Sequence, residues 1–317
     1  MKRFIIFFVA AFFGIISIAS SASTCTWTAA SAGTWSTGSN WTNCSGGGGV
    51  PGSGDIVIFS ASSTQNATID TVVNVTGITI TSGYTGTISQ NTGKTITVGS
   101  SGYSQSGGTF VGSSGSDAIT VNGIFNLDVG TTFTSTKGNL TLNGTSTFSG
   151  TFGNNSGTVY LAVTTRPITV TGSSTFYALN LGNGLASGNP NATITVATGT
   201  TLTVQSSTVF GIYQNNVYLS GGGEIDAQGN VSQLTNVWAY TLATSTFNFV
   251  LNGTGNQKID AGSGSDFRLP SITINKSSGI VTLAGSFVIS GNWTNNNGAS
   301  VMNAGTSTVK FGSETDA

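Results

Sequence analysis

Two carboxylates that could take part in hydrolysis lie in the stretch "GGGEIDAQGN", residues 221–230. Glu224 and Asp226 are two positions apart, so on a β-strand both side chains would point to the same face. Glycoside hydrolysis needs two carboxylates across the scissile bond and polar or basic partners that hold the sugar. The chain has no His, and Arg166 and Arg268 are its only arginines after residue 22. Because such partners are scarce, we predict no catalytic residue, and we expect the acidic pair to be solvated or to cap a turn.

Asp260 and Asp266, in "IDAGSGSDF", are the residues that could bind a cation. Calcium takes carboxylate and carbonyl oxygens, and oxygen-rich loops supply both. The spacing of these two residues matches no compact calcium loop, and Asp residues in Gly-rich turns usually bond their own backbone. We therefore predict no metal site and no cofactor. Nucleic acid is excluded as a partner, since the net charge is −1 and clustered Lys and Arg residues are absent.

The first residues, "MKRFIIFFVAAFFGIISIASSAS", have the organisation of a secretory signal. A basic start precedes an apolar run from Phe4 to Ala19, and small residues follow, with a cleavage point after Ala22. A retained membrane anchor is the alternative, although the apolar run is shorter than a comfortable bilayer span. We predict a signal peptide over residues 1–22, a secreted or cell-surface mature protein, and no membrane span after signal removal.

Cys25 and Cys44 are the only cysteines, and an oxidising destination favours a disulfide between them. A zinc site is the weaker alternative, because neither His nor further Cys is available to complete the ligand shell. Trp27, Trp35 and Trp41 lie within the loop that this disulfide would close. We expect these rings to be buried in a cap, and the alternative is an aromatic platform that contacts carbohydrate.

The composition predicts extended β-structure with many turns. Only 6% of the residues are charged, against about 25% in ordinary soluble domains. Thr suits a pleated, half-exposed surface, and Gly and Asn tolerate positive φ. Thr-x-Thr pairs would suit an array that binds ice, and they occur at Thr79/Thr81, Thr95/Thr97, Thr169/Thr171 and Thr193/Thr195. Such an array needs a constant coil length and the spacing of these pairs is irregular, so we expect ordinary outward-facing Thr.

The chain repeats itself in a degenerate way. Three apolar landmarks recur 91 positions later: Ile168 and Ile259, Phe176 and Phe267, Leu181 and Ile272. A third start at "STVKFGSETDA" matches Val309 and Phe311 to Phe247 and Phe249, so we expect the 317 residues to be a fragment of a longer protein or the last strand to pair elsewhere. Strand units that cannot each bury an apolar face alone are typical of a solenoid.

We predict an all-β, right-handed parallel β-helix, a β-solenoid, with an N-terminal cap made by the tryptophans and the disulfide. The cap is expected over residues 23–54 and the repeats over residues 55–317. An antiparallel β-sandwich array is the alternative, since alternation alone does not distinguish parallel from antiparallel pairing. The residues expected to point inward are Ile168, Val170, Leu181, Ile194, Val196, Ile259, Ile272, Ile274 and Val288.

The N-terminal segment "TCTWTAASAGTWSTGSNWTNCSGGGGVPGSGDIVIF" resembles the first segment of large secreted bacterial β-helix proteins. In those proteins tryptophans around an Asn-Trp pair, here Asn40-Trp41, lead to Pro-x-x-Gly-Asp, here ending at Asp55, and then to the first strand. The later units resemble the repeats of the same adhesin-like or autotransporter-passenger-like group. The stretch "GGGEIDAQGN" is similar to a turn-and-strand signature of polygalacturonase-like, pectin lyase-like β-helix enzymes.

This resemblance implies a secreted or cell-surface scaffold that is structural or adhesive and has no catalytic activity. The partners it implies are cell-surface glycans or other copies of the chain. The alternative is a β-helix protein that binds or cleaves polysaccharide in a groove along the helix.

Overall fold

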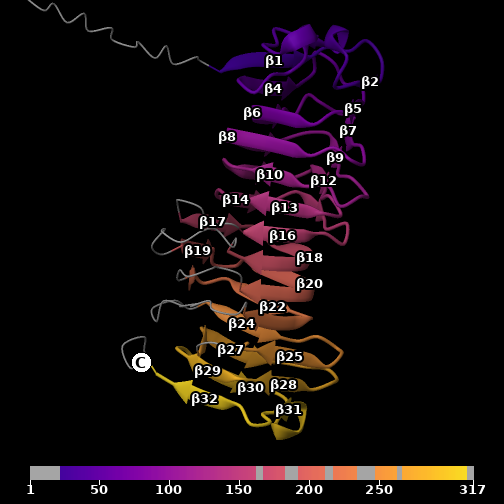
Figure 1. Cartoon of the computed structure of the whole chain (residues 1–317). Coiled ribbons are helices and arrows are strands. Elements are labelled where there is room, and N and C mark those ends of the chain that lie inside the picture. The colour runs from indigo at the N-terminus through magenta and orange to yellow at the C-terminus, as the bar shows by residue number, and fades with distance from the viewer. Residues whose placement is uncertain are drawn as a thin grey trace, which may run out of the picture.

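The computed structural model describes residues 22–161, 167–182, 192–210, 217–233, 247–262 and 266–312. The chain is all-β, with 53% strand and 4% helix, and its parallel strands stack into a β-solenoid of about nine turns. Figure 1 shows an elongated stack with β1 (Ser23–Trp27) at one end and β32 (Thr308–Phe311) at the other. The signal peptide predicted over residues 1–22 lies outside the described residues except for Ala22.

The strands of successive coils form three ladders along the stack. The first ladder contains β1, β4 (Asp55–Phe59), the second halves of β6 (Val73–Ile80) and β8 (Ile96–Gln105), β11 (Phe125–Leu127), β14 (Ser146–Phe148), β17 (Ile168–Thr171), β19 (Ala192–Val196) and β21 (Val217–Ser220). In the last coils its place in chain order is taken by a separate three-stranded sheet of β26 (Phe267–Leu269), β29 (Ser286–Ile289) and β32.

The second ladder has two parts. The first part is a six-stranded sheet of β2 (Gly33–Thr34), β5 (Ala67–Ile69), β7 (Thr87–Gln90), β9 (Thr109–Val111), β12 (Thr132–Thr134) and β15 (Thr151–Gly153). The second part contains the first halves of β18 (Ser174–Leu181) and β20 (Thr201–Phe210), then β22 (Glu224–Ala227), β24 (Asn248–Leu251), β27 (Ser271–Ile274) and β30 (Trp293–Asn295).

The third ladder completes each coil. It contains the first halves of β6 and β8, β10 (Ile119–Val121), β13 (Asn139–Leu142), β16 (Thr158–Leu161), the second halves of β18 and β20, β23 (Asn230–Gln233), β25 (Gln257–Asp260), β28 (Val281–Ala284) and β31 (Met302–Asn303). The remaining elements are β3 (Trp41–Thr42) and three short 3-10 turns, η1 (Gly38–Asn40), η2 (Gly47–Gly49) and η3 (Ala299–Val301).

Strand direction confirms the parallel solenoid and excludes the antiparallel sandwich. Among the described strands, the pairing of β1 with β3 is antiparallel and every other pairing is parallel. The chain must therefore turn a corner between ladders, and Gly102 is at such a corner inside β8. Its φ is +77°, and a Cβ there would lie 2.4 Å from the Ile124 carbonyl oxygen, so only glycine fits without rearrangement.

The core is one continuous apolar column. It extends through every described coil from Cys25 to Ile289, and the strands alternate between buried and partly exposed residues. All nine residues predicted to point inward are buried, the most exposed being Val288 at 6%. Eight of the nine belong to the apolar column.

Val288 does not belong to it: it lies between Phe287 and Ile289, which do, and it is in register with Arg268 and Lys310. It therefore faces away from the column, and the prediction for this residue is wrong because its burial comes from neighbours on the outer side. For the other eight residues, period-two alternation identified the inward face.

The 91-residue repeat does not superpose coil on coil. Ile168 and Ile259 are both buried, but Ile168 lies in the first ladder and Ile259 in the third. Likewise Phe249 is buried in the second ladder, whereas its predicted counterpart Phe311 lies in β32 and is 65% exposed. Every face has the same alternation, so matching apolar landmarks identifies strands and leaves the face undetermined.

Candidate functional site

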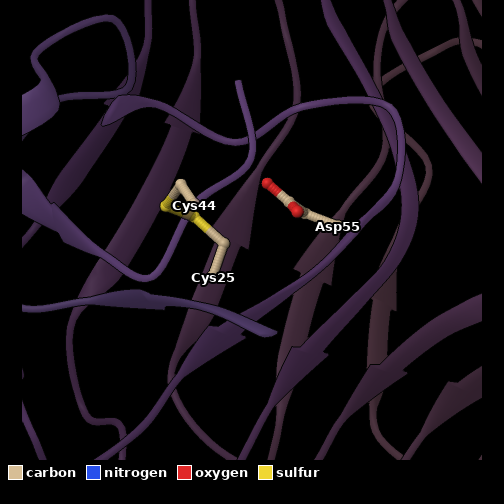
Figure 2. A group of neighbouring side chains, drawn as sticks. All are labelled: Cys25, Cys44 and Asp55. Carbon is tan, nitrogen blue, oxygen red and sulfur yellow. A yellow bond between two sulfur atoms is a disulfide. The ribbon is translucent and has the colours of Figure 1, made fainter. Parts of the chain in front are cut away.

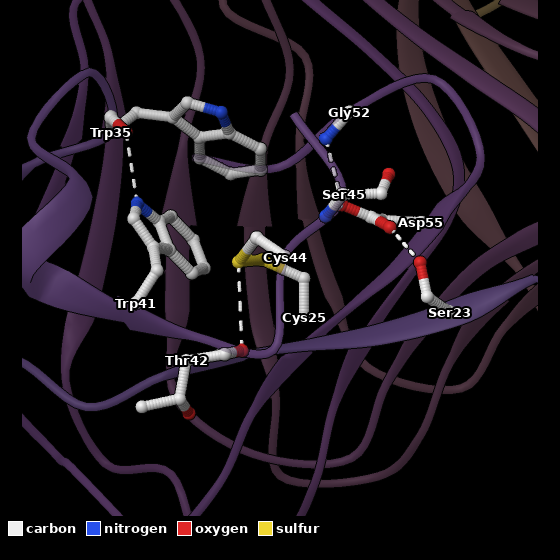
Figure 3. The surroundings of a disulfide bond; sticks show 9 residues. All are labelled: Ser23, Cys25, Trp35, Trp41, Thr42, Cys44, Ser45, Gly52 and Asp55. Atoms are coloured by element: carbon white, nitrogen blue, oxygen red, sulfur yellow. Dashed lines mark hydrogen bonds between the residues drawn. A yellow bond between two sulfur atoms is a disulfide. The ribbon is translucent and has the colours of Figure 1, made fainter. Parts of the chain in front are cut away.

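The predicted cap segment, residues 23–54, forms the first coil of the solenoid. β1 pairs in parallel with β4, and β2 with β5, so both already belong to the ladders. The antiparallel strand β3 then folds back on β1, and the Cys25–Cys44 disulfide joins β1 to the residue two positions after β3 (Figure 3). The predicted disulfide is thus present, and it fastens the chain that closes this end.

The three predicted tryptophans lie inside this end of the core. Their exposed fractions are 0% for Trp27, 2% for Trp35 and 5% for Trp41. The rings pack edge to face, with centroids 4.8 Å apart for both the Trp27–Trp41 and the Trp35–Trp41 pairs, and all three contact Phe59. The Trp41 indole N–H donates to the Trp35 carbonyl oxygen at 2.9 Å (Figure 3). Because a sugar needs an open ring face, this geometry favours the cap over the carbohydrate platform.

Asp55 holds the same end together through hydrogen bonds. Its carboxylate is buried and accepts hydrogen bonds from the Ser23 hydroxyl, from the Ser45 N–H at 2.9 Å and from the Gly52 N–H at 2.8 Å (Figure 3). Burial raises the pKa of Asp55, but these hydrogen bonds together outweigh it and hold the pKa below its ordinary value. The Asp in the Pro-x-x-Gly-Asp motif is therefore an anchor that ties the loop before β4 to β1.

Cys25, Cys44 and Asp55 are close enough to raise the question of a metal site. Their potential ligand atoms lie within 4.8 Å of one another (Figure 2). The two sulfur atoms are joined in a disulfide, so neither is available as the thiolate that a metal requires. The Thr42 carbonyl oxygen lies 3.5 Å from the Cys44 sulfur, but a disulfide sulfur has no S–H group, so this contact is not a hydrogen bond. The group is structural.

The acidic pair lies on the outer face of the second ladder. Glu224 and Asp226 both belong to β22 and both are partly exposed, while Ile225 between them is buried. Glu224 is in register with Thr201 of β20 and with Asn248 of β24. The prediction that both carboxylates share one face is therefore confirmed.

A cavity of about 200 Å³ opens beside Glu224. It is lined by Gly199, Thr200, Thr201, Gly222, Gly223, Glu224 and Asn248. The Thr201 hydroxyl donates to the Glu224 carboxylate at 3.2 Å, so hydroxyl, amide and carboxylate groups face the same space. Such groups can exchange hydrogen bonds with a sugar. The lining residues other than Glu224 were not identified from the sequence. Thr201 and Asn248 are 23 residues before and 24 residues after Glu224, and they are its partners in the neighbouring strands.

Asp226 has a different environment from Glu224. It does not line the cavity. Burial raises its pKa above the ordinary value, and hydrogen bonds from Asn252 and Thr203 offset this only in part. Its Oδ1 atom is buried and has no hydrogen-bond partner among the described residues. Of the two carboxylates of the acidic pair, Glu224 alone therefore lines the cavity.

The structure does not bring Asp260 and Asp266 together around a cation. Asp260 accepts a hydrogen bond from Lys258 Nζ at 2.6 Å and another from the Gly262 N–H at 3.0 Å. Asp266 pairs instead with Lys310 Nζ at 2.8 Å, and residues 263–265 between the two aspartates lie outside the described part. The hydrogen bond from Lys258 and that from Lys310 lower the pKa of Asp260 and of Asp266, respectively.

These observations define a parallel β-solenoid that is sealed at its N-terminal end and polar on its outer faces. Comparisons of the chain with models of protein families, with curated protein sequences and with solved structures found no match. In the described part of the chain, no helix has the length and the hydrophobicity to cross a membrane.

Proposed function

We propose that the chain is a structural, adhesive scaffold without catalytic activity. The observation that carries this proposal is the unbroken apolar column from Cys25 to Ile289. In a solenoid each coil contacts only its neighbours, so a continuous core makes a long body whose sides remain available for contact. At one end β3 pairs with β1 and is held there by the Cys25–Cys44 disulfide, which hinders strand addition at the edge of β1.

The outer faces support an adhesive role. Hydroxyl and amide side chains of neighbouring coils hydrogen-bond to one another: Thr147 with Thr171 at 3.1 Å, and Asn122 with Asn143 at 2.8 Å. With few charges, copies of the chain repel one another little. The exposed hydroxyl and amide groups can in turn exchange hydrogen bonds with neutral glycans. Cell-surface glycans and further copies of the chain are therefore the proposed partners.

The scaffold proposal is tested with the purified mature chain on an array of surface glycans and by sedimentation over a range of concentrations. We expect glycan binding or concentration-dependent association, with no release of reducing ends from any bound glycan. Wild-type protein that stays monomeric and binds no glycan would contradict the adhesive role. Release of reducing ends would contradict the non-catalytic role.

A second candidate function, the binding or cleavage of polysaccharide, is supported by the cavity beside Glu224. The comparison of Glu224→Gln with Asp226→Asn tests it, since only Glu224 lines the cavity. If the cavity holds a sugar, Glu224→Gln weakens binding and Asp226→Asn does not. Equal affinity of both variants and the wild type would remove the cavity from consideration.

Secretion is part of the proposal, together with membership of the adhesin-like or autotransporter-passenger-like group. Export would place Cys25 and Cys44 in an oxidising compartment, where their disulfide persists. Mass spectrometry of protein recovered outside the cell is the direct test, and we expect a mature chain that begins at Ser23. A chain that retains residues 1–22 in the membrane fraction would favour the anchor instead.

A further inference from the structure

A file of threonines runs along the outer face of the second ladder in its first part. Thr87, Thr109, Thr132 and Thr151 occupy equivalent positions in β7, β9, β12 and β15, four consecutive coils. A second file beside it, two residues further along each strand, contains Ser89, Val111 and Thr134 in register and ends at Gly153 in β15, which has no side chain to add. The seven residues other than Gly153 are called the threonine array below. All are partly or fully exposed.

The array is regular although the coils differ in length. The intervals between the four threonines of the first file are 22, 23 and 19 residues. The additional residues are accommodated between the strands, so the register on this face is kept. Irregular spacing in the sequence therefore does not exclude an ordered array on one face.

Three aromatic rings are stacked beneath the array. Phe110, Phe133 and Phe152 point inward from β9, β12 and β15, and their rings stack with interplanar angles of only 9° and 11°. Neighbouring strands in ordinary sheets are rotated by roughly 20–25°, and flat sheets are usually held by stacked side chains. We infer that the stacked rings limit the rotation from one coil to the next, which would keep the side chains above them in nearly parallel rows.

The hydroxyls of the array are not used within the protein. On the first ladder, outward hydroxyls bond to one another, as in Thr195 with Ser220 at 2.7 Å. In the described part of the chain, the side-chain hydroxyls of Thr109, Thr132 and Thr151 have no protein partner. Val111, which has the shape of Thr without its hydroxyl, is 37% exposed in the same array. The face thus offers ordered methyl groups and unused hydroxyls.

We propose that the threonine array binds the surface of crystalline ice. Strands in a sheet are about 4.8 Å apart, and alternate residues of one strand are roughly 6.6 Å apart. These repeats are similar to the distances between equivalent water oxygens along two directions of hexagonal ice. A flat face that holds hydroxyls and methyl groups at these intervals orders water into the same lattice. This inference does not rest on the proposed scaffold function.

The composition of the array favours ice over other occupants. The seven positions contain neither a charge nor an aromatic ring. Protein-binding sites are enriched in aromatic residues and Arg, and sugar sites commonly use ring faces. A water lattice needs neither, because it is recognised by a repeated spacing of small groups.

The test measures thermal hysteresis and incorporation into a growing ice hemisphere, with the full mature chain. We expect wild-type protein to enter the ice, and Thr132→Tyr at the centre of the array to lose most of this activity, because the ring lifts the face off the lattice. Thr132→Val keeps the methyl groups and is expected to retain most of it. Thr141→Tyr on the outer face of the third ladder is the matched control and is expected to behave as the wild type.

Circular dichroism and thermal melting show whether each variant is folded, and Thr109→Tyr repeats the test if Thr132→Tyr is not. Wild-type protein that is excluded from ice to the same degree as an inert protein would overturn the proposal. Equal loss in Thr132→Tyr and Thr141→Tyr would do so as well. Binding to insoluble cellulose or chitin, or dimerisation, that Thr132→Tyr abolishes in the absence of ice activity would identify a polymer or a second copy as the occupant instead.

Discussion

The two parts of the second ladder occupy the same place in the coil but differ on both of their surfaces. In the first part, the rings of Phe133 and Phe152 lie nearly parallel, and the side-chain hydroxyls of the threonines above them have no protein partner among the described residues. At the junction the ring stacking ends: the Phe152 and Phe176 rings are 84° apart, and the six-stranded sheet ends at β15. Beyond it, Glu224 accepts a hydrogen bond from Thr201.

This difference separates two properties that one ladder can have. The inward residues decide whether the face is flat, since stacked rings restrain the rotation between strands. The outward residues decide whether the hydroxyls are available, since a neighbouring carboxylate or amide occupies them, as Asn248 does by accepting from Thr273 at 3.2 Å. The first part is suited to an extended, ordered surface. The second part is suited to a single polar ligand in a cavity.

The largest effect is expected from Phe133→Ala, which removes the central ring of the stack. A buried Phe truncated to Ala lowers the free energy of unfolding by about 3–5 kcal/mol. Phe249→Ala is the matched variant in the second part, where Phe249 is also buried. Urea unfolding should show losses of similar size, whereas ice activity in the folded protein should fall only in Phe133→Ala. Equal ice activity of the two variants would separate flatness from binding and contradict the comparison.

The next largest effect concerns the disulfide. Replacing Cys25 and Cys44 by Ser removes a cross-link over a sequence separation of 19, which is worth about 3 kcal/mol in the chain-entropy model. We expect the loss to be local, because stability in a solenoid propagates between neighbouring coils. Hydrogen exchange should accelerate in β1 and β4 and stay unchanged in β22 and β24. Uniform acceleration along the chain would show that the coils unfold as one unit.

The sequence was sufficient for the fold of each strand, because alternation is local. Ile168 and Ile272 were correctly expected inside, and the Cys25–Cys44 disulfide and the buried tryptophans followed from residue type and compartment. The pairing of strands was not available from the sequence. Thr109 and Thr132 become neighbours only through the register of β9 with β12, and the 91-residue repeat joins residues of different faces.

The candidate site was predictable in part for the same reason. Glu224 and Asp226 share a face because they are two apart on one strand. Their environments differ through side chains on other coils: Thr201 and Asn248 beside Glu224, and Asn252 beside Asp226. The pKa of Asp226 is therefore a property of the stacked coils.

A smaller change in the free energy of unfolding, on the order of 1 kcal/mol for each variant, is expected when Asp128 or Asp226 is replaced by Asn. Asp128 lies between β11 and β12, beside the first part of the second ladder, and hydrogen bonds from Ser106 and Asn126 lower its pKa. Its contribution to stability is complete above the unfolded pKa and is lost as the pH falls through the folded pKa. Asp128→Asn should therefore be less stable than the wild type at neutral pH, and the difference should shrink in acid.

Asp226 is expected to change stability with pH in the opposite direction to Asp128. Burial raises its pKa in the folded state above the unfolded value of 3.8. Its contribution is complete below the unfolded pKa and is lost as the pH rises through the folded pKa. Asp226→Asn should therefore be at least as stable as the wild type at neutral pH, with the gain disappearing in acid. Urea midpoints for both variants between acid and neutral pH provide the measurement. Curves with the same sign for Asp128→Asn and Asp226→Asn would refute this assignment.

The smallest effect is expected from Lys258→Ala, which removes the ion pair with Asp260 on the outer face of the third ladder. The Lys258 side chain is 48% exposed and that of Asp260 is 37% exposed, so water screens the interaction. Exposed pairs of this kind contribute a few tenths of a kcal/mol. The urea midpoint should hardly move, and the small shift should vanish at high salt, since screening removes what remains of the attraction. A loss comparable to that of Phe133→Ala would mean that outward contacts stabilise the coils as much as the inward column does.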